Sequence, residues 1–257
     1  MNWAWLAFIA AAYVVGSIPF GVIIGNIRGI DIRAHGSRNP GATNVARVLG
    51  KKLGLLCFAL DFLKGALPVL VSGFALGVIN QPVTALTPVQ QWMWLCVAMA
   101  AVLGHMFSIF IGLRGGKGVA TAFGAMLAMW PVLTLPTLGA MVVWYAAVRM
   151  THYVSVASML AAISVPISYL LAHPLAKVLD QPWSDTMDAI VHSLPGFVVT
   201  SALAVVVVWK HRGNIARLRR GEEPKAGRHV RRGDVLAEEG FTAEAQSAPR
   251  GGAEERK

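Results

Sequence analysis

The feature that most constrains this chain is a series of long stretches without a charged side chain in its first 209 residues. Those residues carry 11 Lys or Arg and 5 Asp or Glu, whereas the shorter remainder carries 12 and 8. Over the whole chain 14% of residues are charged, against roughly 25% in soluble domains. This scarcity excludes a single soluble globular domain and indicates a membrane protein with several spans.

Six apolar stretches are long enough to consider as spans. They cover residues 3–27, 53–80, 91–111, 118–148, 153–172 and 191–209. A membrane-spanning helix needs about 20 residues, and five of the stretches fit one helix each. The stretch 118–148 would reach roughly 46 Å as one helix, against a hydrocarbon core of about 30 Å. It also contains Pro131 and Pro136, so we expect a hairpin of two short helices that turns near Trp130 and Pro131.

The distribution of positive charge sets the expected topology. The loop 28–52 holds Asp31 and six cations, and residues 80–113 hold no Lys or Arg. With a hairpin at 118–148, the cationic C-terminal segment lies on the same side as the loop 28–52, as the positive-inside rule requires. We therefore predict an all-α polytopic membrane protein with seven transmembrane helices, its N-terminus outside and its C-terminus cytoplasmic.

The same composition predicts two parts and disfavours other classes of protein. Residues 1–225 are expected to form an integral membrane domain, and residues 226–257 a polar, disordered cytoplasmic tail. The net charge of +10 fits cytoplasmic loops, so no nucleic-acid partner is predicted. Cys57 and Cys96 lie in apolar runs, which argues against a disulfide framework or a thiolate zinc site. We expect no metal, no cofactor and no cleaved signal peptide.

Three polar segments would meet on the cytoplasmic side. The first, residues 36–47, is rich in turn-forming residues, and its glycines allow backbone amides to approach an anion closely. Ser37 could add a hydroxyl and Arg47 a bidentate guanidinium to a phosphate. The alternative is a capped turn with an arginine on lipid headgroups.

The second segment is residues 112–121, preceded by Gly104 and His105. Its glycines lead into a predicted helix with Lys117 among them, which again favours an anion site. It is not a Walker A loop, because Gly118 stands where a magnesium-binding Ser or Thr is required. The alternative is a flexible loop whose charges only obey the positive-inside rule.

The third segment, residues 210–225, follows the last span. If the helix continues, His211, Asn214 and Arg217 share one face and could close the site. The alternative is a polybasic segment that binds anionic lipid. Inside the second span, Asp61 and Lys64 should face the protein interior, because an isolated charge at a helix centre costs about 2.5–3.5 kcal/mol. They either pair with each other or orient the arginine or asparagine of the first segment.

These residues resemble a known family. The patterns are Gly-Ser-x-Asn-Pro-Gly-Ala-Thr-Asn-x-x-Arg, Gly-His…Gly-Gly-Lys-Gly-Val-Ala-Thr and His-Arg-x-Asn-Ile-x-Arg-Leu…Gly-x-Glu. Over roughly residues 3–225 they are similar to the signature motifs of the PlsY family, membrane acyl-phosphate:glycerol-3-phosphate acyltransferases. The resemblance implies transfer of a fatty acyl group from acyl phosphate to the 1-hydroxyl of glycerol 3-phosphate, giving lysophosphatidic acid and phosphate. It further implies the inner cell membrane, a cytoplasmic active site, lipid contact and a partnership with the enzyme that makes acyl phosphate.

The resemblance also assigns roles to residues. It implies that His211 and Asn214 are catalytic, and that Asp61, Lys64, His105 and Arg217 support them. The implied substrate-binding residues are Ser37, Asn39, Gly41, Asn44, Arg47, Gly115, Gly116, Lys117, Gly118, Thr121 and Glu223. Glycine amides would reach the acyl phosphate, and Glu223 would brace the third segment. Either His211 or a phosphate oxygen of the donor could take the proton. Ser108, Leu113 and Arg114 depart from the usual family residues.

An organic-anion or phosphate transporter is the competing class, because basic loops, glycines and a charge pair within a span would also suit one. Transporter sites usually lie near the membrane midplane between broken helices. Here the motif glycines cluster at one membrane face, which favours chemistry on an amphiphile at the surface.

Overall fold

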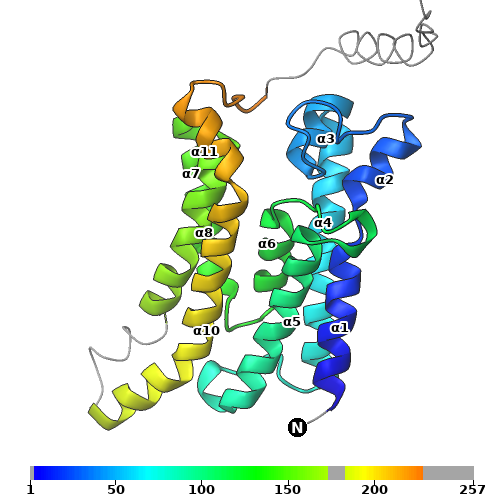
Figure 1. Cartoon of the computed structure of the whole chain (residues 1–257). Helices are drawn as coiled ribbons and strands as arrows, with labels where there is room; N and C mark the ends of the chain where they lie inside the picture. The colour runs from blue at the N-terminus through cyan, green and yellow to red at the C-terminus, as the bar shows by residue number, and fades with distance from the viewer. Residues whose placement is uncertain (1–2, 173–182, 228–257) are drawn as a thin grey trace, which may run out of the picture.

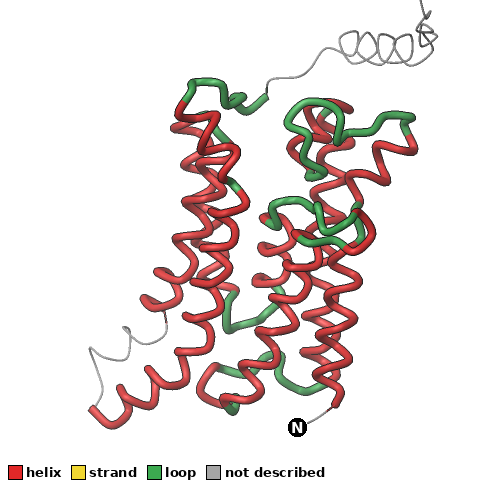
Figure 2. The backbone as a smooth tube through the Cα atoms, in the orientation of Figure 1, coloured by secondary structure: helices red, strands yellow, loops and turns green. Residues whose placement is uncertain are grey.

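The computed structural model describes residues 3–172 and 183–227, and only the backbone of 183–190. Most of the predicted tail and part of the polar loop before the last span lie outside these ranges. The described residues form helices and loops without a strand (Figure 2). The α-helices are α1 (Trp3–Ser17), α2 (Phe20–Ile27), α3 (Ala42–Leu49), α4 (Lys51–Ala75), α5 (Pro88–Met106), α6 (Val119–Leu127), α7 (Thr134–Thr151), α8 (Val154–Leu170), α10 (Trp183–Lys210) and α11 (Arg212–Arg219), with short 3-10 turns at Val83–Ala85 and Ile109–Ile111.

The helices form two groups that run in roughly the same direction (Figure 1). In one group α1 packs on α5 and α4 packs on α6, with α3 against α4 at one end. In the other, α8 packs between α7 and α10, and α11 extends from the end of α10. Contacts of α10 with α5 join the groups. The arrangement places α3, α11 and the start of α6 toward one end of the bundle.

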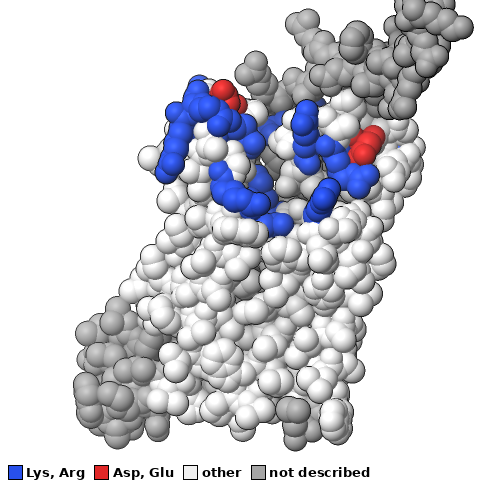
Figure 3. Space-filling view, in the orientation of Figure 1, with Lys and Arg blue, Asp and Glu red and all other residues white. Residues whose placement is uncertain are grey.

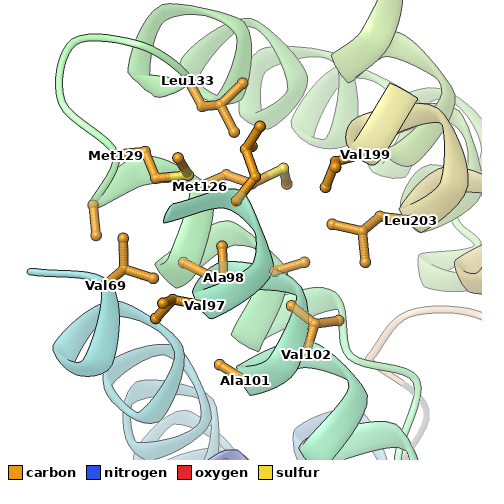
Figure 4. Packing of buried hydrophobic residues seen from close by; sticks show 14 of the residues in the cluster. Val69, Val97, Ala98, Ala101, Val102, Met126, Met129, Leu133, Val199 and Leu203 are labelled. Atoms are coloured by element: carbon orange, nitrogen blue, oxygen red, sulfur yellow. The ribbon is translucent and has the colours of Figure 1, made fainter. Parts of the chain in front are cut away.

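The core is centred on α5. Its Val97, Ala98, Ala101 and Val102 are buried against side chains from α4, α6 and α10 and from the turn after α6 (Figure 4). Large apolar side chains on the outer faces of the helices are exposed instead, as expected for a surface in contact with lipid. Examples are Leu55, Leu67, Phe74, Val142 and Val205.

Four helical segments of the described chain are long and apolar enough to cross a membrane: residues 3–27, 51–75, 88–111 and 191–210. The helix Val154–Leu170 is apolar but shorter. Over the described residues the chain is therefore all-helical with several candidate spans, as predicted. The full count of seven crossings stays a prediction.

The long stretch 118–148 is two helices, as expected. α6 ends at Leu127, α7 begins at Thr134, and the turn between them includes Trp130 and Pro131. The amide of Asn80, in the α4–α5 connection, donates to the carbonyl of Trp130 at 3.1 Å. The turn therefore lies at the same end as the connection that carries no Lys or Arg. With nine residues, α6 rises only about 14 Å, which is about half the thickness of the hydrocarbon core.

One expected helix is interrupted. The stretch 3–27 was predicted as one helix, but α1 ends at Ser17 and α2 begins at Phe20. Pro19 lies at the break. Proline interrupts a helix because it has no amide hydrogen and its ring clashes with the preceding turn.

Charge is segregated along the bundle. In the view of Figure 3 the Lys and Arg side chains of the described residues gather at the end where α2, α3 and α11 lie, and the other described residues on this face show none. Such segregation matches the charge pattern on which the predicted topology depends.

Candidate functional site

The structure brings all three polar segments around one cavity of about 340 Å³. The first segment contributes the turn before α3, the second the start of α6, and the third α11 with the loop that follows it. Predicted site residues that line the cavity are Ser37, Asn39, Gly41, Asn44, Arg47, Asp61, His105, Lys117, Gly118, His211, Asn214 and Glu223. They come from parts of the chain more than 170 residues apart, and they meet at the positively charged end of the bundle.

Asn44 holds the first segment in shape. Its side-chain oxygen accepts a hydrogen bond from the amide of Ser37 at 2.8 Å, and its nitrogen donates to the carbonyls of Ile32 at 2.8 Å and His35 at 3.1 Å. Gly36 precedes this turn with φ +61°, a conformation that favours glycine. The amide of Asn44 is thus occupied by the loop backbone, so the residue positions Ser37 rather than reaching a ligand itself.

Two helix N-termini open into the cavity. α3 begins after Gly41, whose amide donates to the side-chain oxygen of Asn39 at 3.0 Å. α6 begins after Gly118, which has φ +78°. The first turns of both helices line the cavity through Ala42, Thr43, Val119 and Ala120. The first amides of a helix lack partners within it and form the positive end of its dipole, so this arrangement favours an anion.

Two cations lie among these helix ends. The Arg47 guanidinium donates to the carbonyl of Pro224 at 3.3 Å; burial lowers its pKa, an effect that the charge of Glu223 opposes and that of Arg217 reinforces. Burial also lowers the pKa of Lys117 to about 8, with Glu223 opposing the shift. Both side chains are still mainly protonated at neutral pH, but they have lost much of their hydration. A bound phosphate would compensate for that loss.

Glu223 joins the third segment to α8. One carboxylate oxygen accepts hydrogen bonds from Ser155 at 2.7 Å and Asn214 at 2.6 Å, and the other accepts from the Arg217 guanidinium at 2.8 Å. Burial would raise the pKa of Glu223, but the hydrogen bonds from Asn214 and Ser155 and the charge of Arg217 outweigh it and lower the pKa. Both oxygens are therefore in use, and Glu223 braces the wall on which Asn214 lies.

His211 presents one ring nitrogen for a ligand. The side chain is 2% exposed, and its Nδ1 lies 2.8 Å from the carbonyl oxygen of Val207. A carbonyl only accepts, so Nδ1 carries the hydrogen and Nε2 has a free lone pair. Burial, and then the charge of Lys117, lower the pKa of His211 to about 4, although Val207 and Glu223 oppose them. The imidazole is neutral at physiological pH, so Nε2 can accept a hydrogen bond from a hydroxyl but is a weak base.

The glycines of the second segment serve packing more than anion binding. The amide of Gly116 donates to the carbonyl of His105 at 3.1 Å. A Cβ on Gly115 would overlap that carbonyl, and one on Gly116 would overlap the His105 ring. Gly115 and Gly116 lie outside the lining of the main cavity, whereas Gly118 is part of it. The expectation that all three glycine amides face the acyl phosphate is therefore corrected: the Gly116 amide is already bound to His105.

Thr121 also lies away from the cavity. It is fully buried in α6, and its hydroxyl has no hydrogen-bond partner among the described residues. Its backbone carbonyl packs closely against Gly65 of α4, where a Cβ would collide with it. The position of Thr121 thus supports a packing role between α4 and α6.

The buried charge pair forms as the spacing predicted. The Lys64 ammonium lies 2.7 Å from an Asp61 carboxylate oxygen and also donates to the carbonyl of Ile18 at 2.7 Å. The Nδ1 of His105 lies 3.6 Å from the same oxygen of Asp61. Of the two alternatives, the mutual pair is the one observed. It fixes the break between α1 and α2 to α4, beneath the cavity.

The cavity has an apolar side that the motifs did not reveal. It is formed by Phe58 of α4, Phe123 of α6, and Met141, Trp144 and Tyr145 of α7. The Trp144 indole donates to the hydroxyl of Ser158 at 3.2 Å, which fixes the ring. Phe58, Met141 and Tyr145 are each at least 40% exposed, so this side faces outward between α4 and α7. In the sequence these residues are indistinguishable from other apolar residues of their spans, and Ser155 carries no motif either.

The likeness of this chain to known proteins extends over most of its length. Residues 6–221 match the family described as glycerol-3-phosphate acyltransferase. The glycerol-3-phosphate acyltransferase of Trichlorobacter lovleyi is 40% identical over 222 residues, which are 86% of this chain and 97% of that protein. That of Aquifex aeolicus is 38% identical over 218 residues, 85% of this chain and 97% of the relative.

Solved structures show the same likeness. The crystal structure of PlsY (YgiH), an integral membrane glycerol 3-phosphate acyltransferase, in its glycerol 3-phosphate form has a TM-score of 0.69 and 36% identity, covering 87% of this chain and 96% of that one. The lysophosphatidic acid form has a TM-score of 0.67 and 35% identity, covering 91% and 99%.

Proposed function

The chain belongs to the PlsY family of integral membrane glycerol-3-phosphate acyltransferases, and we propose that its acyl donor is a fatty acyl phosphate. It is accordingly an acyltransferase that acts on glycerol 3-phosphate in a membrane. The proposed reaction forms an ester at the 1-hydroxyl and releases lysophosphatidic acid and phosphate.

The observation that carries the donor proposal is the junction of an anion site with an apolar wall in one cavity. Lys117, Arg47 and two helix N-termini surround the polar part, and α4 and α7 supply apolar side chains on the outward side. An acyl phosphate is an amphiphile with a phosphate at one end of its chain. Its headgroup fits the polar part of the cavity while its chain remains in contact with α4, α7 or lipid.

We assign the glycerol phosphate to Ser37, Arg47 and Lys117. The first amides of α3 and α6, which follow Gly41 and Gly118, are assigned to the phosphate of the donor. Holding two anions side by side supplies proximity for the reaction, and the cations and amides offset their mutual repulsion.

The chemical step needs no acyl-enzyme. The 1-hydroxyl oxygen bonds to the carbonyl carbon, the bond from that carbon to the phosphate oxygen breaks, and phosphate leaves with its electron pair. The departing phosphate gains negative charge as this bond breaks, so we assign the hydroxyl proton to it. His211, whose pKa is lowered to about 4, orients the hydroxyl through Nε2, and Asn214 lies beside it.

We also propose the cellular arrangement. The chain would cross the inner cell membrane seven times, with its N-terminus outside and with the active site and C-terminus on the cytoplasmic side. Residues 1–225 would form the membrane domain and residues 226–257 a tail. The gathering of Lys and Arg at the end of the bundle that holds the cavity supports this orientation (Figure 3). The cytoplasmic side is where soluble glycerol 3-phosphate would arrive, and the enzyme that makes acyl phosphate is the proposed supplier of the donor.

Purified protein in detergent tests the donor directly. We expect release of phosphate from palmitoyl phosphate only when glycerol 3-phosphate is present, together with an equal amount of lysophosphatidic acid. Activity with palmitoyl coenzyme A but not with palmitoyl phosphate would refute the assigned donor. A transporter would form no product in this assay, because transport requires two compartments.

A further inference from the structure

A second cavity, of about 280 Å³, adjoins the catalytic cavity beside α3 and α4. The two cavities share Ala42, Thr43, Arg47, Phe58, Trp144 and Val154. Residues that line only the second cavity include Ala46, Lys51 and Gly54. The Arg47 side chain therefore stands between two spaces, and a ligand could pass from one to the other without leaving it.

The second cavity changes from cationic to apolar along α4. Lys51, Gly54 and Phe58 follow one another at i, i+3 and i+7, so they lie on one face of this helix. Lys51 is exposed at the first turn, and Phe58 lies about two turns further along. No side chain separates Lys51 from Phe58 on this face, because the residue between them is Gly54. Ala46 of α3 packs where a Cβ on Gly54 would lie. The face suits a molecule with an anionic head and an apolar chain.

Arg47 has donors left for such a molecule. One terminal nitrogen of its guanidinium donates to the carbonyl of Pro224, and the remaining N–H groups have no partner among the described residues. A guanidinium offers five donors in a planar fork, which matches a phosphate. Together with the Lys51 ammonium, it could bind a phosphate in the second cavity as well as in the first.

We propose that the second cavity is the release site for the lysophospholipid product. The product's phosphate would move from the catalytic side of Arg47 to a place between Arg47 and Lys51, while its acyl chain passes out between Phe58 and Trp144. This inference rests on the proposed function for the identity of the product. The occupant is a single-chain anionic amphiphile because the cavity pairs two cations with aromatic side chains and continues directly from the place where such a molecule forms.

Two matched variants test the site. Lys51→Gln removes the cation that lines the second cavity but not the catalytic one, and Lys52→Gln removes its neighbour, which lines neither cavity. Binding of radiolabelled lysophosphatidic acid to the purified protein in detergent is measured by scintillation proximity, and inhibition by added product is measured alongside. We expect Lys51→Gln to weaken binding about three- to fivefold, as loss of one exposed ionic contact would. Lys52→Gln should change it little, and the KM for glycerol 3-phosphate should stay the same in both.

Several results would overturn the proposal. Equal weakening by the two variants would indicate general attraction of anions to this face, and no weakening by Lys51→Gln would remove the site. Displacement of bound lysophosphatidic acid by phosphatidylglycerol with equal potency would indicate an ordinary lipid site, and displacement by inorganic phosphate alone would indicate an anion site without a chain. The binding measurement needs no turnover, so a failure of the acyl-phosphate assay would be recognised separately.

Discussion

Lys117 gives the proposed mechanism an alkaline limit that can be measured. Its pKa is lowered to about 8, first by burial and further by the charges of Arg217 and Arg47. Because the ammonium must be protonated to bind phosphate, about ten lysines are charged for each neutral one at pH 7, and the ratio is reversed at pH 9. The value of kcat/KM for glycerol 3-phosphate should therefore fall about tenfold between pH 7 and pH 9.

Bound substrate should shift the alkaline limit to higher pH. A bound phosphate favours the protonated amine, so the limit in kcat, which reports the occupied enzyme, should lie at higher pH than the limit in kcat/KM. Lys117→Arg should move the limit in kcat/KM above pH 10, since arginine keeps its proton there. Lys52→Arg serves as the matched control at an exposed position outside the cavity, and it should leave the limit near pH 8.

The assay is the pH dependence of initial rates with palmitoyl phosphate, joined to glycerol 3-phosphate binding over the same pH range. The affinity for glycerol 3-phosphate should fall at the same pH as kcat/KM. For a variant with little turnover, this binding measurement alone tests the role of Lys117. An unchanged limit near pH 8 in Lys117→Arg would refute the role of this ammonium. So would a wild-type profile that stays level up to pH 10.

Three further predictions concern other parts of the site. His211→Ala should lower kcat by about a hundredfold, because without this side chain the hydroxyl is no longer held in position for attack, while wild-type kcat stays level from pH 5.5 to 7. A fall with an apparent pKa near 6.5 would instead identify a histidine base. Gly116→Ala should abolish stable packing of the second segment. The control Gly139→Ala in α7, where a Cβ meets only an ordinary contact, should fold and act normally. The yield of detergent-solubilised protein and its activity measure both effects. Lys64→Met should lower the free energy of unfolding of the purified protein by about 3–5 kcal/mol, because it leaves the buried Asp61 carboxylate unpaired. Adding Asp61→Asn should restore part of this loss. Equal stability of the single and double variants would contradict the prediction.

The main elements of the fold could be predicted because lipid imposes simple rules on a sequence. Segments without charge must be helices, and positive loops must lie on one side. Those two rules also indicated that 118–148 is a hairpin and that three distant segments share one end. The interruption at Pro19 was missed because hydropathy does not detect a break within an apolar run. Attention to proline chemistry alone could have revealed it.

The motifs placed the site but could not say which polar groups remain available for a ligand. Asn44 and Gly116 have the chemistry to bind an anion, yet hydrogen bonds to their neighbours occupy them in the fold. Whether an amide is occupied depends on tertiary contacts between residues far apart in the sequence. The same is true of Ser155, whose hydroxyl holds Glu223 from 68 residues away.

Some charged side chains of the site have a partner of opposite charge and others have none, and the unpaired ones indicate what the cavity binds. The buried carboxylates each have a cation in contact: Asp61 has Lys64, and Glu223 has Arg217. Arg47 and Lys117 have no carboxylate within ion-pair distance among the described residues, although both line the cavity. Among the described residues that line the catalytic cavity, these two cations are the ones left to meet a ligand with full charge.

Adding the helix ends gives the approximate charge that the cavity can accommodate. The N-termini of α3 and α6 each contribute about half a positive charge, which with Arg47 and Lys117 makes about +3. One phosphate, at about −1.5 to −2, leaves this excess partly unbalanced, whereas two phosphates bring it close to neutral. Electrostatics therefore favours the complex with both substrates bound over either complex with one, and the transfer of a neutral acyl group between the two anions leaves that balance unchanged.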